Sequence, residues 1–217
     1  MKNILLKSTA LMMLLGVYAL FSTTIAQQSS ITLEASQIIS NFKFVDSGGT
    51  QNKDYMPTYS GGYNFGYTYA LDMGAFFNLG VGMRRSGATL IVDASNYQWD
   101  LQYGQARLTA GYAYDLGRIK PYAKIGAYYG FLLKANQIIN NENFDIKDTQ
   151  SIEKGDVGLY FSPGAKMDIS DAIAVYAEYS YLLGLKNVET TADGQKAKNR
   201  ASILTLGLSF AIQQLSN

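Results

Sequence analysis

The 217-residue sequence contains neither cysteine nor histidine. Without cysteine, the chain can form no disulfide framework and no thiolate metal site. Without histidine, it lacks the imidazole that acts as general base in Ser-His-Asp triads and as a ligand in most zinc sites. These two absences remove the usual hydrolase chemistry, so we expect no enzymatic activity and no cofactor.

Charge and proline are also scarce. Charged residues make up 16% of the chain, against about a quarter in ordinary soluble domains. The formal net charge is only +1, so nothing in this balance indicates nucleic acid as a partner. Tyrosine (17) and glycine (21) are abundant instead, while there are 3 prolines. Abundant tyrosine is typical of strands and of the aromatic girdles at membrane interfaces.

Only one long apolar run occurs, at residues 10–21. Two lysines precede it and a small-residue site ending at Ala26 follows, which predicts a cleaved signal peptide over residues 1–26. The run is shorter than the roughly 20 residues of a membrane-spanning helix. Residues 27–217 would then be one domain. If this domain enters a membrane, it must do so as a closed barrel, because only helices and barrels satisfy their backbone groups in lipid.

Hydrophobic residues follow a period of two along most of the chain. In residues 172–185 large apolar side chains occupy one parity, and small or polar ones such as Glu178 and Gly184 occupy the other. This alternation indicates strands between unlike environments. Because the apolar face is larger than a soluble sheet needs, we expect it to face lipid and the polar face to line a narrow lumen.

Turn signals divide the chain into eight such strands. They are expected at residues 31–46, 59–71, 75–92, 98–115, 119–135, 154–168, 172–185 and 199–212. The connections after the second, fourth and sixth strands are short, and most of the others are longer and polar. This asymmetry is typical of outer-membrane barrels, with short periplasmic turns and both termini in the periplasm.

The predicted fold is therefore all-β, an eight-stranded antiparallel up-and-down transmembrane barrel closed by pairing of the last strand with the first. A soluble lipocalin-like barrel, with its apolar face inside, is the alternative, but eight strands that all carry glycine and charge on one face would make a poor dry core. Along the strands, we expect Phe42 and Phe44 to point outward and Trp99 to join the outer aromatic girdle. An irregular alternation near Gly104 predicts a β-bulge.

The inward parity carries charges of both signs. The predicted lumen network consists of Arg84, Arg107, Asp115, Lys124, Lys134, Lys166 and Glu178, with Asp168 on the same parity. One reading is a cation-lined pore for small anions. The other is a plug, because an eight-stranded barrel is only wide enough for its own side chains. Buried charges must pair, and Glu178 is expected to pair with Arg107, Lys124 or Lys166.

Four segments carry a resemblance to a known family. They are KPYAKIGAYYGFLL at 120–133, KGDVGL at 154–159, YAEYSYLLGLKNV at 176–188 and KNRASILTLGLSF at 198–210. These segments resemble the PorT-like outer membrane β-barrel family of Bacteroidetes, whose barrels are OmpA/OmpX-like. The resemblance implies an eight-stranded barrel in the outer membrane of a Gram-negative host. The founding member of that family serves a protein-secretion machine.

The predicted loops offer the remaining functional signals. Asp145, Asp148 and Glu153 lie in a polar loop that is either merely solvated or able to bind calcium through oxygen ligands. The strand extension at residues 85–103 could present a sheet edge to another protein. We therefore expect a structural or surface-interaction role in the cell outer membrane, with transport or protein secretion as the alternative. The expected partners are outer-membrane lipid and other envelope or secretion proteins.

Overall fold

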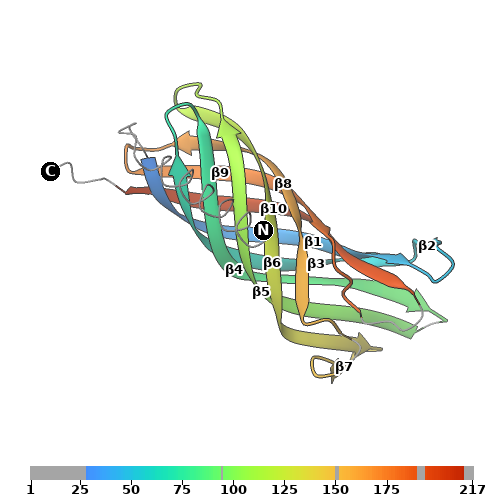
Figure 1. Cartoon of the computed structure of the whole chain (residues 1–217). Coiled ribbons are helices and arrows are strands. Elements are labelled where there is room, and N and C mark those ends of the chain that lie inside the picture. Colours follow the sequence, from blue (N-terminus) through green and yellow to red (C-terminus); the bar gives the residue numbers. More distant parts are fainter. Residues whose placement is uncertain (1–27, 94, 150–151, 190–193, 213–217) are drawn as a thin grey trace, which may run out of the picture.

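Eight long antiparallel strands form a closed ring in the computed structural model, which describes residues 28–93, 95–149, 152–189 and 194–212 (Figure 1). The long strands are β1 (Gln28–Val45), β3 (Met56–Ala70), β4 (Ala75–Val92), β5 (Ser95–Ala113), β6 (Ile119–Ile139), β8 (Gly155–Asp168), β9 (Ile173–Gly184) and β10 (Lys196–Ile212). Two short strands, β2 (Gln51–Asn52) and β7 (Glu142–Asp145), pair with the ends of β1 and β6, respectively. In the described ranges, no helix has the length and apolar character needed to cross a membrane.

The first and last long strands close the ring. β1 pairs with β10 without a break from Ser29 opposite Ile212 to Val45 opposite Lys196. All other neighbours in the ring are consecutive in the chain and antiparallel. The predicted eight-stranded up-and-down barrel is therefore confirmed, including its closure by pairing of the last strand with the first.

The apolar parity of the strands faces outward. Leu33, Phe65, Leu79 and Leu206 are between 46% and 65% exposed, although a soluble protein would bury such side chains. Their inward neighbours, such as Thr205, are buried. The lipocalin-like alternative, with its greasy face inside, is therefore wrong.

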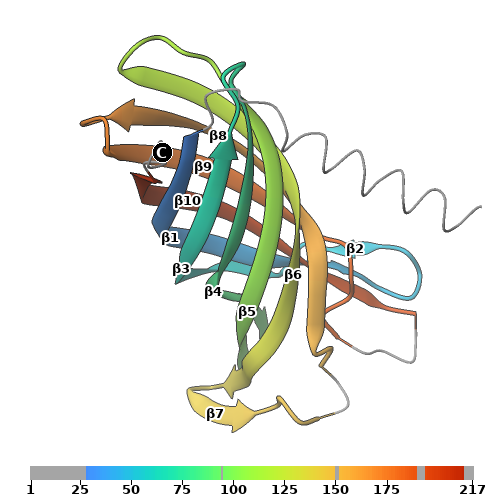
Figure 2. The same cartoon turned by 60° about the vertical axis from the view of Figure 1, so that its left-hand side comes forward.

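The two ends of the barrel differ in shape. One end, called here the short-turn end, holds the connections 71–74, 114–118 and 169–172. The first residues of β1 and the last residues of β10 also lie there. Gly74 and Gly117 shape two of these turns with positive φ values of 90° and 83°, which glycine adopts at little cost. At the opposite, long-loop end, the β4–β5 hairpin, the β1–β3 hairpin and β7 project beyond the rest of the ring (Figure 2).

A β-bulge interrupts the pairing of β5 with β6. Gln102 pairs with Lys134 and Tyr103 with Leu132, so Leu133 has no opposite residue. The irregularity predicted near Gly104 is present, but the extra residue lies on the neighbouring strand. Because one extra residue reverses the side-chain alternation, Leu132 and Ala135 both point inward.

Above the bulge, the long-loop end has an apolar core of its own. We call it the upper cluster, and its buried members are Phe42, Ala88, Trp99, Leu101, Tyr103, Leu132, Ala135, Ile152 and Val188. The predictions that Phe42 and Trp99 face outward are wrong, since they are 3% and 8% exposed. Both keep the inward parity of their strands, even numbers in β1 and odd numbers in β5. The strands continue beyond the polar lumen as an extension at the long-loop end. There the inward side chains pack against one another.

Candidate functional site: the barrel interior

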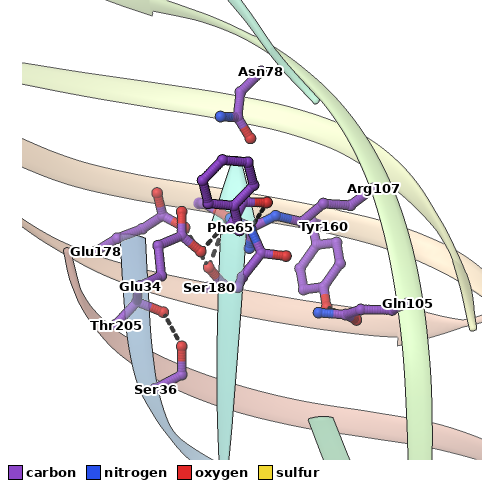
Figure 3. A network of polar contacts seen from close by, with 12 residues as sticks. Glu34, Ser36, Phe65, Asn78, Gln105, Arg107, Tyr160, Glu178, Ser180 and Thr205 are labelled. Atoms are coloured by element: carbon purple, nitrogen blue, oxygen red, sulfur yellow. Dashed lines mark hydrogen bonds and ion pairs between the residues drawn. The ribbon is translucent and has the colours of Figure 1, made fainter. Parts of the chain in front are cut away.

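The middle of the barrel is filled by ion pairs that cross the lumen (Figure 3). The first joins the Glu34 carboxylate on β1 to the Arg107 guanidinium on β5. Glu34 also accepts a hydrogen bond of 2.8 Å from the Tyr176 hydroxyl on β9. One buried carboxylate thus ties three strands together through charge-assisted contacts, the strongest class of hydrogen bond.

The second ion pair lies beside the first. Lys124 Nζ on β6 is 2.6 Å from Glu178 Oε2 on β9. The same carboxylate accepts hydrogen bonds from the Tyr122 hydroxyl at 2.9 Å and the Ser180 hydroxyl at 2.8 Å. Glu178 is 2% exposed, so these donors replace the water that a buried carboxylate requires.

The third ion pair stands nearer the long-loop end. Arg84 on β4 contacts the Asp156 carboxylate on β8, which also accepts hydrogen bonds from the Tyr128 hydroxyl and from Asn199 Nδ2, at 3.0 and 2.8 Å. The Arg84 guanidinium lies 4.7 and 4.9 Å from the ring centroids of Tyr103 and Tyr128. These cation–π contacts stabilise the arginine on its apolar side.

These networks leave little free space at mid-barrel. The cavity between Arg84, Arg107 and Tyr160 has a volume of about 20 Å³, which is room for about one water molecule. On the long-loop side, the upper cluster closes the barrel with apolar side chains. Ile152 and Val188, from two different connections, pack into that closure. The described interior is therefore a plug in its middle and at its upper end.

The predicted lumen residues fall into three groups. Arg84, Arg107, Lys124 and Glu178 are buried in the networks just described. Of the partners proposed for Glu178, Lys124 is the one that contacts it, whereas Arg107 pairs with Glu34. Lys166 lies in a separate cavity at the short-turn end.

The other two predicted residues are not buried charges. The Asp115 side chain is 72% exposed at the rim of the short-turn end, 3.9 Å from Lys120. Lys134 is exposed on the outside of the barrel, contrary to the prediction. The bulge at Leu133 explains this, because it moves Lys134 to the opposite face of the strand.

Two buried carboxylates of these networks, Glu34 and Asp156, were not predicted as lumen residues. Both follow the inward parity of their strands. Glu34 lies between buried Thr32 and half-buried Ser36, and Asp156 shares its parity with buried Tyr160. Charge balance was the overlooked signal. The predicted network held more cations than acids, and buried cations require partners.

In the described part of the polar loop between β6 and β8, two acidic side chains pair with lysines. Asp148 pairs with Lys154 at 3.1 Å, and Glu153 pairs with Lys186 at 2.7 Å. Within the described ranges, no three acidic side chains gather closely enough to hold a metal ion. Lysines therefore compensate Asp148 and Glu153, while Asp145 accepts a hydrogen bond from the Lys147 backbone N–H.

An aromatic group joins the upper cluster to the surface at the long-loop end. The Tyr55 ring lies 5.9 Å from that of Trp99 and stacks on Phe44 at 5.3 Å. Burial, with the nearby Glu189 carboxylate adding to it, raises the pKa of Tyr55 to about 12. Burial likewise raises the pKa of Glu189 above its usual value. Among the described residues, aromatic side chains therefore pack this end from the upper cluster toward the surface.

Comparison with known proteins agrees with this architecture. The model of the family described as outer membrane protein beta-barrel domain matches residues 8–210. Neisserial surface protein A (NspA) is similar in structure, with a TM-score of 0.50 and 14% identity over 83% of this chain and 96% of that one. A major outer membrane protein from Thermus thermophilus has a TM-score of 0.53 and 12% identity over 86% and 100%.

Structural likeness at these identities shows the fold alone. No match was found among curated proteins. The family match, by contrast, spans nearly the whole chain and agrees with the outward apolar face and the closed ring of strands. The chain belongs to the outer membrane protein β-barrel domain family.

Proposed function

We propose that the protein is a non-conducting, non-enzymatic outer-membrane barrel that holds a rigid extension at the cell surface for interaction with other molecules. The observation that carries this proposal is the filled interior. Three buried ion pairs occupy the lumen, and the upper cluster packs the strand extension beyond it. Surface loops on a rigid scaffold commonly carry function, so the surface of this extension is the part of the barrel suited to interaction.

The orientation in the membrane is part of the proposal. Short turns of outer-membrane barrels face the periplasm and long loops face outward, which puts both termini in the periplasm and β7 outside. Residues 1–26, which lie outside the described residues, would export the chain as a cleaved signal peptide. The partners are outer-membrane lipid along the apolar face and envelope proteins at the long-loop end. Membership of the PorT-like group of Bacteroidetes fits the four sequence segments that resemble it.

Conductance tests the filled lumen. We expect purified protein in planar bilayers to show no steady, sizeable current, with a general porin as the positive control. A stable open conductance of the intact protein would overturn the plug and favour the transport alternative.

Cysteine labelling tests the orientation, and the native chain gives no background because it has no cysteine. Asp145→Cys lies in β7 and Ser170→Cys in a short turn. In whole cells, a membrane-impermeant maleimide should label only the first variant, while lysed cells should show both labelled. Labelling of Ser170→Cys alone in whole cells would show the opposite orientation, with the short turns outside the cell.

The surface role is tested by shortening residues 140–149, which removes the β7 hairpin and leaves the ring strands intact. We expect proteins cross-linked to the intact chain on whole cells to be lost from the shortened one. Co-isolation of the same secretion components with both chains would favour the secretion-associated alternative instead.

A further inference from the structure

A polar cavity opens at the short-turn end, below the Glu34 and Glu178 networks. Its volume is about 310 Å³, within the usual range of small-molecule sites. The lining runs from exposed Asp72 and Asp115 at the turns to buried Glu34 and Lys124 at the inner end. Unlike the middle of the barrel, this compartment is not filled by its own side chains.

The cavity wall holds a cation that forms no ion pair within the described residues, although the Asp168 and Asp115 carboxylates attract it at longer range. Lys166 on β8 lies directly opposite Lys120 on β6, and like charges in that position destabilise a sheet. Asp168 compensates Lys120 through a contact of 2.7 Å. Among the described residues, no carboxylate oxygen lies within 4 Å of Lys166 Nζ. The inner carboxylates are also occupied, Glu34 by Arg107 and Glu178 by Lys124.

Hydroxyl and amide groups line the same cavity as this cation. Ser30, Thr68 and the Tyr122 hydroxyl line the same cavity. Thr32 and Asn78 also line the cavity, although Thr32 Oγ1 and Asn78 Oδ1 themselves lie within its wall and have no hydrogen-bond partner within the described part of the chain. These two side chains converge, because a Cβ added to Gly66 would lie 2.6 Å from Thr32 Oγ1 and 3.0 Å from Asn78 Nδ2. Unsatisfied buried groups of this kind are costly and require an explanation.

We infer that this cavity binds a small hydroxylated organic anion of the size of a sugar phosphate, with Lys166 as the cation that receives its charged group. The anion relieves the repulsion between Lys166 and Lys120. Its hydroxyls exchange hydrogen bonds with the serine and threonine side chains of the wall. The closed middle of the barrel makes this a binding compartment rather than a passage.

Titration calorimetry with glucose 6-phosphate on the folded full chain in detergent micelles tests this inference. We expect saturable binding that weakens about tenfold or more in Lys166→Gln, the loss typical of one charge-assisted hydrogen bond. Lys43→Gln, the same substitution on the outer face of β1, should bind like the native chain. Equal affinities for native protein and Lys166→Gln would overturn the site, as would no detectable binding.

Two further probes separate the parts of the ligand. Glucose should bind at least about tenfold more weakly than glucose 6-phosphate, because it lacks the group that contacts Lys166. If inorganic phosphate binds as tightly as glucose 6-phosphate, the role given to the hydroxyls is wrong.

Amine acetylation of the native chain gives a readout that does not depend on a variant's folding. Glucose 6-phosphate should protect Lys166 but not Lys43, as measured by mass spectrometry. Equal modification of Lys166 with and without the ligand would contradict the inference.

Discussion

Glu34 on β1 and Arg107 on β5 form a buried ion pair between strands that are three positions apart around the ring. Their side chains are 2% and 7% exposed, respectively, so neither charge is hydrated. The Tyr176 hydroxyl supports the carboxylate from the far side. The pair thus connects two distant walls of the barrel. Each partner compensates the charge of the other, which would otherwise be costly in the interior.

Removing one partner of this pair should be far more harmful than removing both. We expect Arg107→Met to lower the free energy of unfolding by about 3–5 kcal/mol, because it leaves Glu34 buried without a cation. The double variant Glu34→Gln/Arg107→Met should recover part of that loss. Urea unfolding in lipid vesicles measures the native chain, the two single variants Glu34→Gln and Arg107→Met, and the double variant. Strictly additive losses would show that the two residues do not act as a pair.

Two lysines on β6 provide a matched test of the bulge. Lys124→Met should cost about 3–5 kcal/mol of unfolding free energy, because Glu178 loses its ion pair. Lys134→Met makes the same chemical change at an exposed position, directly after the bulged residue Leu133. Its free energy of unfolding should stay within about 0.5 kcal/mol of that of the native protein. A similar loss for both variants would mean that Lys134 points into the lumen.

Alternation alone predicted most of the barrel. It predicted which face of each strand is apolar, the number of strands and the pairing of β1 with β10. The reason is that a ring with lipid outside and polar groups inside imposes alternation on every strand. The bulge could only be placed near Gly104. Which strand holds the extra residue depends on pairing between β5 and β6, and a single strand's sequence does not contain that information.

The interior was predicted less completely. Alternation identifies which residues face inward, but the pairing of Glu34 with Arg107 depends on how far each strand is shifted along its neighbours. Trp99 was misplaced for a different reason. Aromatic residues near a membrane interface favour the girdle on average, yet its odd position in β5, shared with Arg107, puts it inside.

Trp99 is the only tryptophan and therefore reports on the upper cluster directly. We expect blue-shifted emission that iodide quenches weakly, because the side chain is 8% exposed. Vesicles of brominated lipid should leave the emission almost unchanged, since the ring lies inside the strand extension. Strong quenching by brominated lipid would instead place Trp99 in the outer girdle.

The stability of the long-loop end should depend on Glu189. Burial raises its pKa in the folded chain, so folding favours the protonated acid. Stability is then greatest below the unfolded pKa and falls as the pH rises toward the folded pKa. We expect Glu189→Gln to unfold at higher urea than the native chain at about pH 8 and at a similar concentration at about pH 4.

The emission of Trp99 follows this transition, and Glu142→Gln in the exposed β7 strand serves as its control. The control should keep the native pH dependence. A native-like fall in stability with pH in Glu189→Gln would assign that fall to another group.

The seam between β1 and β10 sets a condition on how the barrel is made. Until the last strand arrives, β1 and the current final strand both expose unpaired backbone groups, which hydrocarbon does not tolerate. A chain arrested before Lys196 therefore has no stable state within the bilayer, however well its earlier hairpins form. Insertion must await the end of synthesis, and nascent hairpins need shielding from one another on the way because their free edges invite aggregation.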